Sequence, residues 1–154
     1  MILGCYYWYP YLGYQEECQQ VPIQFPPQHQ PVQPGLETLM EPKPVFDRSD
    51  YIGSGKLKDK VALVTGGDSG IGRATAVAFA KEGADICIVY YNEHEDAQIT
   101  KSCIEAQGRR CLLMAGDIRD EMFCRKAVAC TVSTFGGLDI LVNNAGVQFP
   151  QASI

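Results

Sequence analysis

Three glycines between positions 66 and 72 carry the clearest chemical signal in the sequence. Gly66, Gly70 and Gly72 follow a short apolar run, Val61–Thr65, and precede a stretch with helical character. Glycine lacks a Cβ, so its backbone can approach a ligand closely, and the free N–H groups at the start of a helix attract an anion. A strand, a glycine-rich turn and a helix in this order predict a binding site for the pyrophosphate of a dinucleotide.

The spacing of these glycines is more specific than their number. The usual dinucleotide pattern is G-x-G-x-x-G, whereas this chain reads TGGDSGIG from Thr65 to Gly72. This form resembles the glycine loop of the short-chain dehydrogenase/reductase family. The string LDILVNNAG, at residues 138–146, resembles the family's strand that ends in an NNAG loop. Asp117, in the segment AGDIRD, lies where the family places an aspartate beside the adenine ring.

The N-terminal part narrows the resemblance to one branch of the family. The strings PPQHQPVQPGLE, MEPKPVF and GSGKLKDK resemble the N-terminal extension of the glucose/ribitol-dehydrogenase-like, stress-associated branch. The resemblance covers residues 35–154 and includes the Asp68-Ser69 pair of the loop. It implies an NAD(P)-dependent oxidoreductase that transfers hydride between a nicotinamide cofactor and a hydroxyl or carbonyl group of a small-molecule substrate. It also implies a homo-oligomer for the full-length enzyme.

The resemblance further implies which residues contact the dinucleotide. They belong to the glycine loop, to the ends of the second and third predicted strands and to the NNAG loop: Gly66, Asp68, Ser69, Gly70, Ile71, Gly72, Tyr90, Asp117, Ile118, Asn143, Ala145 and Gly146.

The choice between NADP and NAD depends on the end of the second predicted strand. An acidic residue there would bind the adenosine ribose hydroxyls and favour NAD, but the sequence has Tyr90. The absence of that acid favours NADP. Family members that prefer NADP often carry a basic residue just before the second loop glycine, where this chain has Ser69, so either cofactor stays open. Arg73 could contact a phosphate, but its place on the helix predicts a solvent-exposed arginine.

The chemistry of the family depends on a serine and a Tyr-x-x-x-Lys pair, in which the lysine lowers the pKa of the tyrosine that acts as general acid and base. No tyrosine of the 154 residues has a lysine four positions on: Tyr51 leads to Gly55, Tyr90 to His94 and Tyr91 to Glu95. No catalytic residue is predicted, and His29 and His94 are expected to be solvent-exposed. We expect the cofactor-binding half of a longer enzyme; the alternative is a truncated protein that binds a nucleotide or a partner without catalysis.

The elements that must position these residues alternate along the chain. Continuous apolar runs predict buried strands, and glycines end the helices between them. The predicted strands are 61–65, 85–90, 110–115 and 138–142, and the predicted helices are 71–81, 93–107 and 121–135. This alternation predicts an α/β fold, a Rossmann-type doubly wound parallel sheet of spatial order 3-2-1-4, truncated after the fourth strand. The ligand crevice is then expected at the carboxyl ends of the first and fourth strands.

The apolar face of the third predicted helix is read from its periodicity. Cys124, Val128, Val132 and Phe135 recur at helical spacing, which predicts that they face the core. Cys87 lies in the middle of a predicted strand and is expected to behave as a small core residue.

Residues 1–50 are predicted to be an extended or disordered N-terminal arm, and residues 51–154 the N-terminal portion of an NAD(P)-binding domain. Aromatic residues gather between positions 6 and 14, and five prolines with interspersed glutamines follow between positions 22 and 34. Proline fixes φ and removes a backbone donor, so this stretch is not expected to pack as a regular element. The arm either covers the domain or a neighbouring subunit, or is a disordered tail, which is favoured for residues 1–25.

Composition and charge exclude several classes of function. Hydrophobic residues make up 46% of the chain and charged residues 20%, which is ordinary for one globular domain. The net charge is −5, of which −4 lies in residues 1–50. The sequence shows no basic face, which argues against nucleic acid as the main partner. No apolar run is long enough to span a membrane. The seven cysteines form no C-x-x-C pair, so neither a disulfide framework nor a metal site is predicted, and a cytoplasmic location is expected.

Overall fold

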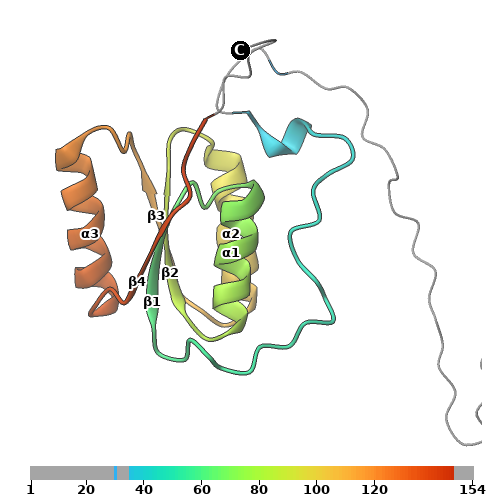
Figure 1. The fold of residues 1–154 in the computed structure, drawn as a ribbon, viewed down its shortest axis with the longest axis horizontal. Coiled ribbons are helices and arrows are strands. Elements are labelled where there is room, and N and C mark those ends of the chain that lie inside the picture. Colours follow the sequence, from blue (N-terminus) through green and yellow to red (C-terminus); the bar gives the residue numbers. More distant parts are fainter. Residues whose placement is uncertain (1–29, 31–34, 148–154) are drawn as a thin grey trace, which may run out of the picture.

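A parallel sheet of four strands forms the centre of the computed structural model, which describes residue 30 and residues 35–147. The strands are β1 (Val61–Thr65), β2 (Asp85–Tyr90), β3 (Cys111–Ala115) and β4 (Ile140–Asn143), and their spatial order is β3-β2-β1-β4 (Figure 1). All three strand pairs are parallel. The predicted doubly wound α/β sheet and its strand order are therefore confirmed.

Helices connect the strands and cover both faces of the sheet. α1 (Gly70–Lys81) and α2 (His94–Ala106) lie on one face, and α3 (Glu121–Phe135) lies on the other (Figure 1). A single turn of 3-10 helix, η1 (Glu37–Leu39), precedes the sheet. Among the described residues, no helix combines the length and the apolar character needed to cross a lipid bilayer.

Strand β2 is buried along its whole length because it lies between two layers of helix. Side chains alternate along a strand, so β2 contributes to two separate cores. Ile86 and Ile88 belong to the core beneath α1 and α2, whereas Cys87 and Val89 belong to the core beneath α3. The core position of Cys87 confirms its prediction, and burial raises the pKa of its thiol to about 11.

The face that α3 turns toward the sheet differs from the predicted one. Ala127 and Thr131 are buried, whereas Val128 and Val132 are each 43% exposed. The Thr131 hydroxyl donates to the carbonyl of Ala127 at 2.7 Å, so it is satisfied within the helix and can be buried. The prediction was wrong for the two valines because the helix turns the residue before each of them, Ala127 and Thr131, toward the sheet. It holds for Phe135, which packs against the core beneath α3.

Element boundaries shift from the predicted ones by up to two residues. α1 begins one residue earlier, α2 is shorter by one residue at each end, and β3 begins one residue later. β4 begins at Ile140, two residues later than predicted, and Asp139, just before it, forms hydrogen bonds with Val61. The Asp139 carboxylate accepts the N–H of Val61 at 2.9 Å, and its own N–H donates to the Val61 carbonyl at 2.9 Å. Asp139 thereby ties the start of β1 to the chain just before β4.

The predicted N-terminal arm lies partly outside the described residues. Its aromatic and proline-rich stretches, with Cys5, Cys18 and His29, fall in residues 1–29 and 31–34. In the later part of the arm, the Arg48 carbonyl accepts a hydrogen bond of 2.7 Å from Lys81 of α1, and Asp47 forms an ion pair with the same lysine. The later part of the arm therefore packs on the domain, and a boundary at residue 50 stays a prediction.

One carboxylate at the end of α1 anchors the chain that leads into β1. Glu82 accepts the backbone N–H of Ser54 at 3.0 Å and that of Lys56 at 2.9 Å, and it also binds the Lys56 ammonium at 3.0 Å. The hydroxyl of Tyr51 donates to the same carboxylate. The Tyr51 hydrogen bond, followed by those from Lys56, lowers the pKa of Glu82 from 4.5 to about 2.

This shift predicts a specific loss of stability in acid. A carboxylate with a lower pKa in the folded chain stabilises the fold above its unfolded pKa, and it loses that contribution as pH falls through the folded pKa. The difference in unfolding midpoint between the wild type and Glu82→Gln is therefore expected to be full at pH 6 and to shrink between about pH 4.5 and pH 2. Urea denaturation across this range measures it. Glu105→Gln, which removes a surface pair with Lys101, is the control, and a Glu82→Gln difference that stays constant with pH would contradict the prediction.

Candidate functional site

The glycine loop and the NNAG loop meet at the carboxyl ends of adjoining strands. Thr65 at the end of β1 pairs in register with Asn143 at the end of β4. The side-chain amide of Asn144 donates to the carbonyls of Thr65 and Gly66, each at 3.0 Å. The Thr65 hydroxyl accepts the N–H groups of Asn144 and Ala145, each at 3.0 Å. Two motifs 80 residues apart are thereby held as one surface, as the resemblance implies.

Thr65 and Asn144 are structural residues of the site that the sequence analysis did not single out. Their signal was present in the motifs themselves, because Thr65 opens TGGDSGIG and Asn144 is the second asparagine of NNAG. Asn143, which was predicted to contact the dinucleotide, is exposed at the end of β4, as are Ala145 and Gly146 beyond it. The predicted NNAG residues therefore line the surface, and Asn144 holds them there.

The loop glycines serve two different purposes. A Cβ on Gly72 would lie 1.9 Å from the Gly66 carbonyl oxygen and 2.6 Å from the Asn144 amide nitrogen. Gly72 is thus required for the protein's own packing of α1 against the turn. Gly70 has a φ of +51°, and a Cβ there would meet no atom within 4 Å. The backbone at Gly70 is therefore open to the outside, and α1 begins there beside the exposed Ile71.

Asp68 lies beneath the loop rather than on its surface. It is 6% exposed, and its carboxylate accepts a hydrogen bond from the Ser69 hydroxyl at 2.9 Å. Burial raises the pKa of Asp68, and the charges of Glu93 and Asp96 raise it further. Glu93, which precedes α2, is also buried, and its Oε1 has no hydrogen-bond partner within the described part of the chain. The adenosine side of the predicted site is therefore rich in buried carboxyl groups.

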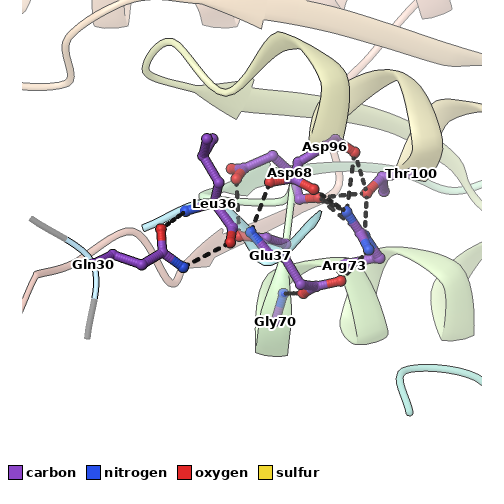
Figure 2. A network of polar contacts seen from close by, with 9 residues as sticks. Gln30, Leu36, Glu37, Asp68, Gly70, Arg73, Asp96 and Thr100 are labelled. Atoms are coloured by element: carbon purple, nitrogen blue, oxygen red, sulfur yellow. Dashed lines mark hydrogen bonds and ion pairs between the residues drawn. The ribbon is translucent and has the colours of Figure 1, made fainter. Parts of the chain in front are cut away.

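Arg73 was predicted to be solvent-exposed, and that prediction was wrong. It is 3% exposed and lies between α1, α2 and the glycine loop (Figure 2). Its guanidinium donates to the Asp68 carbonyl at 2.8 and 3.0 Å and to the Thr100 hydroxyl at 2.8 Å. It also pairs with the carboxylates of Asp96, at 3.2 Å, and Glu37. These partners come from distant parts of the chain, so the helical position of Arg73 alone did not reveal them.

Tyr90 ends β2 at the place where an acid would favour NAD. Its ring is buried, and its hydroxyl forms a hydrogen bond of 3.0 Å with Nδ1 of His94. Burial raises the pKa of Tyr90, and the charges of Asp68 and Glu93 raise it further. His94 is exposed, as predicted.

Asp117 and Ile118 follow β3 at the same edge of the sheet. Residue pairing between Tyr90 and Ala115 brings this loop beside the end of β2. The Asp117 carboxylate binds the Arg119 guanidinium at distances from 2.6 to 3.0 Å, and this hydrogen bonding lowers the pKa of Asp117. Ile118 is 44% exposed. The structure thus brings every predicted contact residue to one edge of the sheet, with Asp68 and Tyr90 buried below it.

Comparison with known sequences is consistent with this arrangement. Residues 60–153 match the family model described as short chain dehydrogenase. General stress protein 39 of Bacillus subtilis (strain 168) is 61% identical over 133 residues, which are 86% of this chain and 46% of that protein. Glucose and ribitol dehydrogenase of Daucus carota is 39% identical over 137 residues, or 85% of this chain and 47% of that protein. The chain thus spans about half the length of these relatives.

Solved structures with the same arrangement contain both kinds of nicotinamide dinucleotide. A short chain dehydrogenase from Mycobacterium paratuberculosis bound to NAD matches 64% of this chain and 41% of its own, with a TM-score of 0.61 and 42% identity. A short chain dehydrogenase from Burkholderia cenocepacia J2315 in complex with NADP matches 59% of this chain and 37% of its own, with a TM-score of 0.55 and 48% identity.

Proposed function

Because the chain belongs to the short-chain dehydrogenase family, we propose that its glycine loop and NNAG loop bind the nicotinamide dinucleotide of an oxidoreductase. The observation that carries the proposal is the open start of α1 at Gly70, two residues before Gly72, which approaches Asn144 of the NNAG loop. A Cβ at Gly70 would occupy this open space, so the glycine leaves room for a phosphate. The residues present therefore fit the dinucleotide.

Each proposed contact follows from the position of its residue along the sheet edge. Gly66 and the start of α1, Gly70–Gly72, would hold the pyrophosphate. Asp68, Ser69 and Tyr90 would be on the side of the adenosine ribose, and Asp117 and Ile118 on the side of the adenine. Asn143, Ala145 and Gly146 would orient the nicotinamide. When bound, the dinucleotide supplies or accepts the hydride, and the residues of this chain bind and orient it.

The structure adds two arguments against NADP to the sequence argument in its favour. Arg73 is already paired with Glu37 and Asp96, so it does not supply a free cation for a 2′-phosphate. Asp68 and Glu93 add negative charge near Tyr90, which disfavours a phosphate there. The absence of an acid at Tyr90 still favours NADP, so the proposal includes both dinucleotides and a titration must rank them.

For the complete enzyme we propose hydride transfer between this cofactor and a hydroxyl or carbonyl group of a small-molecule substrate, in a cytoplasmic homo-oligomer. Family membership and the relative described as a glucose and ribitol dehydrogenase support this class of reaction. The 154 residues contain no Tyr-x-x-x-Lys pair. The 154-residue chain is therefore proposed to bind the cofactor without turning it over. A nucleotide-binding protein without catalytic activity stays the second candidate.

Calorimetric titration with NADP and NAD, in oxidised and reduced forms, tests this proposal. We expect saturable binding of at least one dinucleotide at one site per chain. We also expect no change in nicotinamide absorbance with a panel of sugars and polyols, because general acid–base groups contribute about 10²–10⁴-fold to rate and are missing here. Lack of binding by a folded chain would overturn the proposal. Turnover that persists through purification and disappears in Asn143→Ala would show that the chain is itself catalytic.

A further inference from the structure

The N-terminal segment reaches the glycine loop through one buried carboxylate. Glu37 of η1 is 6% exposed. One oxygen of its carboxylate accepts the N–H of Gly70, and the other pairs with the guanidinium of Arg73 (Figure 2). Its own N–H donates to the Asp96 carboxylate at 3.0 Å. Glu37 therefore connects the first residue of α1 with the buried polar group that supports the loop.

The backbone around Glu37 is held in place by local hydrogen bonds. The side-chain amide of Gln30 donates to the Leu36 carbonyl at 2.8 Å and accepts the Leu36 N–H at 2.7 Å (Figure 2). The Met40 N–H donates to the Glu37 carbonyl at 3.0 Å and closes the single turn of η1. The carboxylate is thus presented to the loop from an ordered turn.

Glu37 occupies the N–H of Gly70 but not the space around the Gly70 Cα. A Cβ built on Gly70 meets no atom within 4 Å, the atoms of Glu37 included. Ile71, the next residue of α1, is 79% exposed. A phosphate at this end of α1 would therefore use the N–H groups of Ile71 and Gly72, the next two of the first turn, beside the Glu37 carboxylate that holds Gly70. In that arrangement the segment supports the site without blocking it.

We propose that Glu37 is a positioning residue for dinucleotide binding, an inference that rests on the proposed function. Glu37 fixes the Gly70 backbone directly, and it fixes the Asp68 carbonyl through Arg73. A loop already held in its binding conformation loses less conformational freedom when the ligand binds, so its affinity is higher. The matched family region begins at residue 60. The N-terminal segment thus adds to the site a residue from outside that region.

Coupling of this kind is reciprocal. If docking of Glu37 strengthens dinucleotide binding, the dinucleotide must strengthen docking of Glu37 by the same factor. Hydrogen exchange of the amides of residues 37–40 and of Gly70 is therefore expected to slow when the dinucleotide binds. A role for Glu37 in stability alone would leave exchange in the segment unchanged by the ligand.

The test compares dinucleotide affinity in the 154-residue chain for the wild type, Glu37→Gln and Glu37→Ala. Glutamine keeps an acceptor for the Gly70 N–H but loses the charge that pairs with Arg73, whereas alanine loses both. We expect affinity to fall in that order, by about tenfold in Glu37→Ala, which is within the usual range of coupling between sites. Leu39→Ala is the matched control, because Leu39 lies in the same turn with its side chain 66% exposed. It should bind as the wild type does.

The outcomes separate this inference from the proposed function. A folded wild type that binds neither NADP nor NAD overturns both. A wild type that binds, together with a Glu37→Ala variant of equal affinity, overturns the role of Glu37 and leaves the proposed function standing. If Glu37→Ala does not fold, hydrogen exchange in the wild type decides. Slower exchange in residues 37–40 with saturating dinucleotide supports the proposal, and unchanged exchange overturns it.

Discussion

Replacing Gly70 with valine is expected to reduce dinucleotide binding at least ~100-fold, because the side chain occupies the space in front of the helix N–H groups that a phosphate must reach. The Cβ would enter a region with no protein atom within 4 Å, so the substitution blocks the ligand without a clash inside the fold. The φ of +51° at Gly70 adds backbone strain of about 1–2 kcal/mol for a residue with a Cβ. Calorimetric titration measures the affinity, and urea denaturation measures the strain.

Gly108→Val provides a matched control for that strain. Gly108 has a φ of +72°, and a Cβ there also meets nothing within 4 Å. It lies in the turn between α2 and β3, at the amino end of β3 and so at the edge of the sheet opposite the site. Both variants are expected to lose similar stability, while only Gly70→Val loses binding. Equal affinity of Gly70→Val and the wild type would refute the assignment of the pyrophosphate to the start of α1.

Replacing Arg73 with methionine is expected to destabilise the fold by about 3–5 kcal/mol, because it leaves buried carboxylates without their cation. The side chains of Glu37 and Asp96 are 7% and 0% exposed, so water cannot readily replace the guanidinium. The Asp68 carbonyl also loses two hydrogen bonds. Urea denaturation followed by circular dichroism gives the change in the free energy of unfolding.

A surface pair supplies the comparison for Arg73. Arg125 and Glu121 form an ion pair of 2.7 Å on α3, and both side chains are 77% exposed. Arg125→Met is expected to change the free energy of unfolding by no more than about 1 kcal/mol, as is usual for exposed pairs. Adding Glu37→Gln and Asp96→Asn to Arg73→Met should recover part of the loss, because it removes the unpaired charges. A loss in Arg73→Met no larger than in Arg125→Met would contradict the burial argument.

The sequence by itself determined the architecture and the edge of the sheet at which the two motifs meet. Continuous apolar runs such as residues 86–90, separated by helical stretches and glycines, are compatible with a parallel sheet covered on both faces. Right-handed crossovers then leave few strand orders, and the observed β3-β2-β1-β4 order is the predicted one. Because parallel strands end at one edge, the TGGDSGIG and NNAG motifs had to meet there. These features depend on local patterns and on general rules of chain connection.

Only the tertiary structure decided which side chains of these elements are buried and what they bind. Arg73 lies 36 residues from Glu37 and 23 from Asp96, so no local period could show that its charge is neutralised inside the protein. Gly70 and Gly72 are both glycines of the motif, yet a Cβ at Gly70 would meet open space and one at Gly72 would clash with the Gly66 carbonyl. On α3, hydrophobicity favoured Val128 and Val132, but the close approach of helix and sheet buried Ala127 and Thr131. In each case the result depends on contacts between distant segments, whose geometry exists only after the chain has folded.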